Sequence, residues 1–131
     1  MPSGVMCEEY RLSVPAKEES LLCVRLSTAG VMAQCRIDMN MMDEFKHAVS
    51  EACFALIHQR NTSERLSIRL RRYEDVLTVL CSLEPECRLV TDAPVPDASV
   101  CGTVLETMAD KVEIDSSEDG IHSITLYAYC L

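Results

Sequence analysis

The chain has 131 residues, of which 48% are hydrophobic and 25% are charged, and its net charge at pH 7 is −9. This length and composition are typical of one globular domain, residues 1–131, with a sizeable core. The acidic charge argues against nucleic acid as a partner, and no apolar run reaches the roughly 18 residues needed to span a membrane.

The beginning of the chain predicts a strand followed by a helix. Residues 8–14 alternate loosely between polar and apolar side chains, and Pro15, which cannot donate to a sheet ladder, is expected to end the strand. Acidic residues then open a helix that continues over residues 21–34. Gly30 weakens this helix, so we expect close packing around it. The small and apolar residues on one side of the helix are Leu22, Leu26, Ala29 and Ala33.

A second helix has the clearest periodicity in the chain. Asp43 is expected to cap its start, and the helix continues to His58. Apolar residues at helical spacing place one stripe along it and predict a buried face. The stripe consists of Phe45, Ala48, Val49, Ala52 and Leu56.

A hairpin is expected in the middle of the chain. Residues 65–72 alternate strictly, with Leu66, Ile68 and Leu70 on one side and polar residues on the other. After a short loop, residues 76–83 return as a more apolar strand. The polar outer side of the first strand predicts an antiparallel sheet that is covered on one face only.

The last third predicts a loop, a short helix and two strands. Residues 84–97 contain three prolines and are expected to form the loop. The helix is expected near residues 99–109, and strands over 111–115 and 121–129 are joined by a turn. The apolar side of this helix consists of Val100, Val104 and Met108.

The predicted order is strand, helix, helix, strand, strand, helix, strand, strand. Helices gathered on one face of a mostly antiparallel sheet form an α+β two-layer sandwich, here with about three helices.

The cysteines are expected to be reduced. No two of them form a C-x-x-C pair, and neither they nor the histidines show ligand spacing, so no metal site is expected. The first ten residues lack the basic start of a secretory signal, which favours buried thiols in a cytoplasmic protein. The eight cysteines are Cys7, Cys23, Cys35, Cys53, Cys81, Cys87, Cys101 and Cys130.

Three short motifs lie between Val14 and Cys53, and they keep the spacing of a known family without any insertion or deletion. They begin with Val-Pro-Ala at 14–16, continue with Arg-Leu-Ser-Thr-Ala-Gly-Val at 25–31 and end with Ala-Val-Ser-Glu-Ala-Cys at 48–53. These motifs resemble those of the bacterial anti-sigma factor serine kinases, small members of the GHKL superfamily of ATPases. The resemblance implies the histidine kinase-like, Bergerat-type ATPase fold. Near the end, residues 105–112 and 125–129 resemble the last helix and the terminal strands of that family.

The residues that would bind magnesium and adenine differ from the family's pattern. The family has a magnesium-binding asparagine on the second helix, whereas this chain has Ala55, whose methyl group offers no oxygen ligand. The family has Asp-x-Gly beneath the adenine, and the matching positions are Leu83 and Pro85. Leucine cannot accept a hydrogen bond, and proline lacks a backbone donor.

The phosphate-binding motif is altered as well. The family's Gly-x-Gly at the start of the last helix corresponds to Ser99 and Cys101, with Gly102 nearby. The lid before it is reduced to the short stretch from Arg88 to Asp97. Three independent losses predict that the chain needs no cofactor, and that ATP and magnesium would matter only if the site had been rebuilt.

Two residues of the second helix have alternative interpretations. Glu51 stands at the family's general-base position, where it is either a vestige of catalysis or a surface glutamate. Without a bound phosphoryl donor it cannot catalyse transfer, so no catalytic residue is expected. Phe54 lies off the core stripe, and its ring either fills the vacated pocket beside Ala55 or widens the helix core.

The leading functional prediction is a regulatory protein-binding module that resembles an anti-sigma factor and does not bind ATP. The alternatives are an active serine/threonine kinase with a rebuilt ATP site and a structural dimerisation partner of an intact paralogue. The resemblance implies a sigma factor or an anti-sigma factor antagonist as partner, contact through Arg25, and a homodimer. An acidic surface also suits a partner with basic patches. A basic strip formed by Arg69, Arg71 and Arg72 is interpreted as a solvated sheet face or, alternatively, a partner surface.

Overall fold

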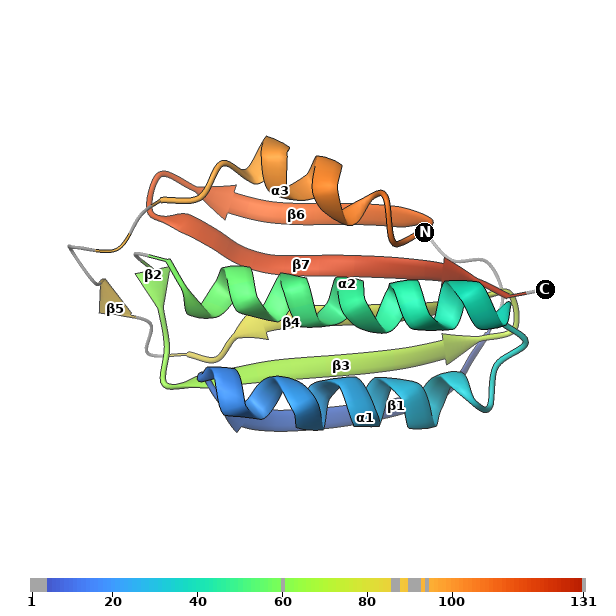
Figure 1. Cartoon of the computed structure of the whole chain (residues 1–131). Helices are drawn as coiled ribbons and strands as arrows, with labels where there is room; N and C mark the ends of the chain where they lie inside the picture. Colours follow the sequence, from blue (N-terminus) through green and yellow to red (C-terminus); the bar gives the residue numbers. More distant parts are fainter. Residues whose placement is uncertain (1–4, 60, 86–87, 90–92, 94, 131) are drawn as a thin grey trace.

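The computed structural model describes residues 5–59, 61–85, 88–89, 93 and 95–130. Within these ranges it is an α+β two-layer sandwich, as expected: a five-stranded antiparallel sheet carries three α-helices on one face (Figure 1). The strand order across the sheet is β1 (Met6–Pro15), β3 (Arg65–Tyr73), β4 (Val76–Leu83), β7 (Gly120–Tyr129) and β6 (Lys111–Ser117).

The helices follow one another across the sheet. After a 3-10 turn (Glu18–Ser20), α1 (Leu21–Met32) packs on the side of β1 and β3, α2 (Met39–Ile57) over β4 and β7, and α3 (Ala98–Leu105) against β6 (Figure 1). A second, two-stranded sheet pairs β2 (Asn61–Thr62) with β5 (Arg88–Leu89). None of the described helices is long and apolar enough to cross a membrane.

Tight turns set the sheet register. Glu74 and Asp75 join β3 to β4, and Glu118 and Asp119 join β6 to β7. Gly120 closes the second turn with a φ of 133°. Residues with a Cβ atom rarely adopt this positive φ, whereas glycine adopts it readily. Both hairpins were predicted, and their strands follow the predicted ranges closely.

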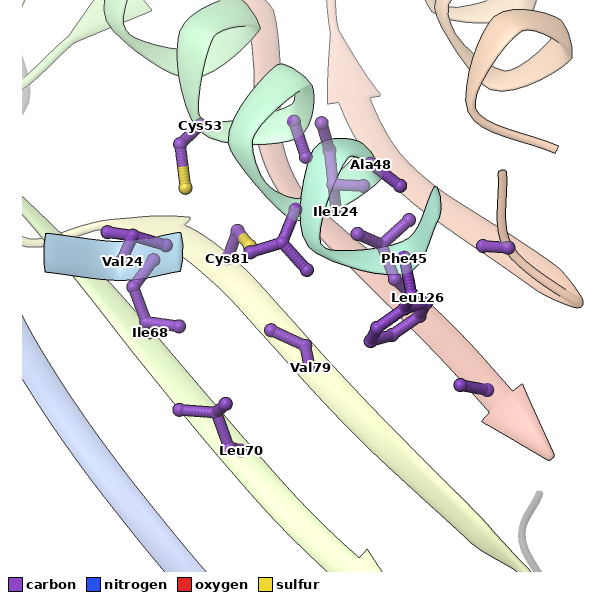
Figure 2. Packing of buried hydrophobic residues seen from close by; sticks show 14 of the residues in the cluster. Val24, Phe45, Ala48, Cys53, Ile68, Leu70, Val79, Cys81, Ile124 and Leu126 are labelled. Carbon is purple, nitrogen blue, oxygen red and sulfur yellow. The ribbon is translucent and has the colours of Figure 1, made fainter. Parts of the chain in front are cut away.

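The α2 stripe forms the centre of the core. All five predicted stripe residues have no exposed surface, and Figure 2 shows Phe45 and Ala48 above the sheet residues Val79 and Leu126. The predicted start at Asp43 is wrong. The helix begins at Met39, because the carboxylate of Asp38 accepts the backbone N–H of Asn40 at 2.9 Å and caps it.

Most of the predicted apolar side of α1 and of α3 faces solvent, including Leu22, Leu26, Val100 and Val104, whereas Met108 packs partly against the core. On α1 the buried residues are Val24, Thr28, Val31 and Met32, and on α3 the buried residue is Leu105. Both helices lie over the edges of the sheet. Each helix therefore buries one face against the sheet and leaves a second apolar face in contact with solvent. The close packing expected at Gly30 is also wrong, because a Cβ there would meet nothing within 4 Å.

A buried amide joins the end of α2 to β7. The side chain of Gln59 is almost wholly buried. Its Oε1 accepts the backbone N–H of Ile121 at 2.8 Å, and its Nε2 donates to the carbonyl of Ile121 at 2.7 Å. The amide therefore satisfies both backbone groups of one residue beside the hairpin turn, which would otherwise be buried without partners.

We expect Gln59→Ala to lower the free energy of unfolding by about 1–3 kcal/mol, because it leaves both Ile121 groups buried and unpaired. Urea denaturation followed by circular dichroism measures this loss. Gln34→Ala is the matched control, since Gln34 is exposed and its side chain accepts, among the described residues, a single hydroxyl hydrogen bond from Tyr10. Equal losses in the two variants would show that the Gln59 bonds contribute nothing.

A tyrosine on the uncovered sheet face titrates abnormally. The hydroxyl of Tyr127 donates to Glu113 Oε1 at 2.6 Å. Burial, and then this hydrogen bond, raise the pKa of Tyr127 to about 12. The folded state therefore holds the proton more tightly than the unfolded chain, whose tyrosines ionise near ~10.

Stability from the neutral Tyr127 hydroxyl is fully present below pH ~10 and is lost as the pH rises towards about 12. We expect denaturation midpoints of the wild type to fall across this window. Tyr127→Phe should flatten that fall, because phenylalanine does not ionise. An unchanged slope in the variant would assign the alkaline loss to other groups.

Candidate functional site

The predicted nucleotide positions come from three elements that end or begin at one end of the sandwich. Figure 1 places the carboxyl end of α2, the end of β4 and the start of α3 at this end. The residues concerned are Glu51, Ala55, Leu83, Pro85, Ser99 and Cys101.

Glu51 and Cys101 come together between α2 and α3. Burial, and then the negative charge of Glu51, raise the pKa of the half-buried Cys101 thiol. The carboxylate of Glu51 is itself 46% exposed and lies 3.7 Å from His47 Nε2, one helical turn away. This end of α2 therefore presents a solvated carboxylate beside a protonated thiol.

The positions expected to hold metal and base carry apolar groups. Ala55 is half-buried on the same helix as Glu51, and the side chain of Leu83 packs partly against the core. Neither provides an oxygen or nitrogen ligand. Pro85 is exposed and lines a separate hollow of about 270 Å³ with Ser63, Glu64, Arg65 and Glu84.

The N-terminus of α3 is capped by a side chain of the residue that precedes it. The Oδ1 atom of Asp97 accepts the backbone N–H groups of Ser99 at 2.9 Å and Val100 at 3.2 Å. The carboxylate thus lies where a helix N-terminus attracts an anion. Comparison with the Gly-x-Gly motif does not point to Asp97, although an aspartate directly before a helix is an ordinary cap signal.

Neither expected position of Phe54 is observed. Its side chain is 43% exposed, and its ring centroid lies 4.3 Å from the ring of His58 on the outer side of α2. His58 Nε2 in turn lies 2.9 Å from a carboxylate oxygen of Glu18. Phe54 packs at the surface because its position on the helix points away from the sheet. It fills no space beside Ala55.

The predicted lid falls partly outside the described residues. Of the stretch from Arg88 to Asp97, residues 90–92 and 94 are not described, and neither are 86–87 before it.

The outer face of α1 surrounds Arg25 with apolar side chains. Leu22 is 57% exposed and Leu26 is 64% exposed, and both share a helix face with Arg25 and Ala29. Within the described ranges, no hydrogen bond or ion pair joins Arg25 to another residue. We call the set Leu22, Arg25, Leu26 and Ala29 the α1 outer face.

The basic strip on β3 is divided between the two faces of the sheet. Arg71 pairs with Glu9 of β1 at 2.6 Å, and Arg72, on the helix-covered side, pairs with Glu8. Two of the three arginines are thus bound by β1 carboxylates, which reduces the charge they offer to a partner. The three arginines therefore do not form one strip, because Arg69 and Arg71 lie on the uncovered face of the sheet and Arg72 lies on the helix-covered side.

Comparison with known proteins finds one curated relative at a modest level. No family model matches the chain. Over 75 residues the chain is 29% identical to the serine-protein kinase RsbW of Bacillus mycoides (strain KBAB4). The matched stretch covers 56% of the chain and 47% of the relative. The chain therefore spans about half the length of the curated relative it matches. This similarity supports the resemblance drawn from the motifs at the level of the family.

Proposed function

We propose that the chain is a regulatory protein-binding module of the anti-sigma factor type that works without ATP. The observation that carries this proposal is the start of α3, where the Asp97 carboxylate accepts the two backbone N–H groups that a phosphate would need. A bound phosphate would have to displace that carboxylate and lie beside its charge.

The surrounding residues support the same conclusion. Ala55 and Leu83 supply no ligand for Mg²⁺ or adenine, and the Glu51 carboxylate raises the pKa of the Cys101 thiol at the position of the family's second phosphate-binding glycine. Phosphoryl transfer depends on cations that neutralise the phosphates and on a precisely held donor. In this proposal Glu51 is a surface carboxylate and has no catalytic role.

The α1 outer face is the proposed partner surface. Arginine is enriched in binding hot spots, and the exposed Arg25 lies among apolar side chains that would exclude water from a contact. The resemblance to the anti-sigma factor kinases points to a sigma factor or an antagonist protein as the partner, and to a homodimer of the chain. The acidic charge of −9 favours a partner with a basic surface.

Complex formation tests this proposal. The chain is titrated with purified sigma factors and antagonist proteins from the same genome, with and without Mg-ATP, and affinities are measured by calorimetry. We expect a stable complex with one of them and the same affinity in both conditions. Transfer of labelled phosphate to an antagonist would instead establish a kinase. Binding only to an intact paralogue would establish a structural dimerisation role.

A further inference from the structure

Three of the eight cysteines meet in one surface pocket, far from the residues compared with the ATP site. Cys7 of β1, Cys35 after α1 and Cys130 after β7 line a hollow of about 490 Å³. Figure 1 shows that the α1–α2 connection and the carboxyl end of β7 lie at the same end of the molecule, opposite the start of α3. The other lining residues are Gln34, Arg36, Arg72, Tyr73 and Glu74.

Within the pocket, Cys35 and Cys130 form a pair. Both are partly buried against the core, and their side chains lie close enough for each to shift the pKa of the other. Backbone contacts hold both positions: Cys35 Sγ donates to the Val31 carbonyl at 3.5 Å, and the backbone N–H of Cys130 donates to the Asp75 carbonyl at 2.9 Å. Both thiols therefore line one accessible hollow as near neighbours.

A guanidinium lies beside this pair. Arg72 binds Glu8 through one terminal nitrogen, while its buried Nε has no hydrogen-bond partner within the described part of the chain. Burial, and then the negative charge of Asp75, raise the pKa of Cys130, and the neighbouring Cys35 and Arg72 side chains oppose this rise only in part. For Cys35, burial followed by the charge of Cys130 raises the pKa to about 11.

We propose that this pocket is a redox-modification site, in which a small peroxide oxidises Cys35 and Cys130 to a disulfide. The thiolate of one of the two cysteines attacks one peroxide oxygen, the O–O bond breaks, and the departing hydroxide takes a proton to leave as water. The sulfur of the other cysteine then attacks the resulting sulfenic acid, loses its proton and expels a second water. Both sulfurs are oxidised by one electron each, and the peroxide is reduced by two.

Other cysteines are less suited to this reaction. Cys53 and Cys81 face each other in the core but have no exposed surface, which denies an oxidant access (Figure 2). Cys23 is exposed on α1 and does not line the pocket. Cys7 is exposed, and its thiol donates to the carbonyl of Val5 at 3.7 Å. Among the described residues, no group of three or more Cys, His, Asp or Glu side chains could hold a metal ion.

The proposal is tested on the whole chain without any substitution first. The reduced protein is treated with equimolar hydrogen peroxide, remaining thiols are alkylated, and unreduced peptides are mapped by mass spectrometry. We expect a monomer lighter by two hydrogen atoms, with peptides containing Cys35 and Cys130 linked and the link reversed by dithiothreitol. The rate of disulfide formation should rise roughly tenfold per pH unit above neutrality, because the fraction of thiolate rises in the same way.

Variants then assign the pair. Cys35→Ser and Cys130→Ser should each abolish the link, whereas Cys23→Ser, which removes an exposed thiol outside the pocket, should leave its yield unchanged. The proposal is overturned if Cys35 and Cys130 are both alkylated after peroxide treatment, or if either links to Cys7 instead. Because wild-type mapping needs no variant, a substitution that prevents folding leaves the test intact. This site does not depend on the proposed function.

Discussion

Replacing Phe45 with alanine is expected to lower the free energy of unfolding by about 3–5 kcal/mol, the largest loss that we predict for a single side chain. Phe45 has no exposed surface and leads the α2 stripe against the sheet. Removing its ring deletes contacts with the central strands and leaves a cavity that a close-packed core cannot fill. The loss is measured as the change in unfolding free energy on urea denaturation.

The chain offers a matched control for this prediction. Phe54 is the second of its two phenylalanines, and it lies on the same helix with 43% of its side chain exposed. Phe54→Ala makes the same chemical change with little loss of buried area, so we expect less than about 1 kcal/mol. If the two variants lost equal stability, the assignment of Phe45 to the core and Phe54 to the surface would be wrong.

Reversing the charge of Arg25 is expected to weaken the complex with the sigma factor or antagonist at least ~30-fold while leaving the chain folded. A hot-spot arginine typically contributes ~2 kcal/mol or more to binding, and a glutamate there would also repel an acidic contact. The loss should appear mainly in the dissociation rate, measured by surface plasmon resonance. The melting temperature should not change, because Arg25 has no partner within the described ranges.

Lys17→Glu is the control for charge alone. Its side chain is 61% exposed, it precedes α1, and the substitution changes the net charge by the same amount. A general electrostatic effect would change the affinity equally in both variants and would fade with added salt. Normal binding by Arg25→Glu would remove the α1 outer face from the proposed interface.

Sequence patterns predicted the sandwich well because its strongest signals are local. The α2 stripe and the alternation of β3 each report a face that is fully covered, and both were found buried. Periodicity groups the residues that share a helix face, but it does not say which face the sheet covers. For α1 it therefore assigned importance to Leu22 and Leu26, while the covered side contains the polar Thr28.

Features that depend on distant segments could not be predicted in this way. Gln59 meets Ile121 only because α2 and β7 pack together, and Cys35 meets Cys130 only because the α1–α2 connection passes the end of the sheet. Asp97 is different, since its cap signal is local. The motif comparison identified which residues replace the family's ATP ligands, and the structure adds that a carboxylate binds the amides of Ser99 and Val100.

Thermal unfolding with Mg-ATP tests whether the chain is a binding module that works without nucleotide. A ligand at 100 times its dissociation constant stabilises a folded protein by about 2.7 kcal/mol, which raises the melting temperature of a domain of this size by several degrees. An ATP-binding serine-protein kinase of the anti-sigma factor type serves as the positive control. We predict no shift for this chain up to millimolar Mg-ATP. A saturable rise matching that of the control would contradict the proposal and establish a working nucleotide site.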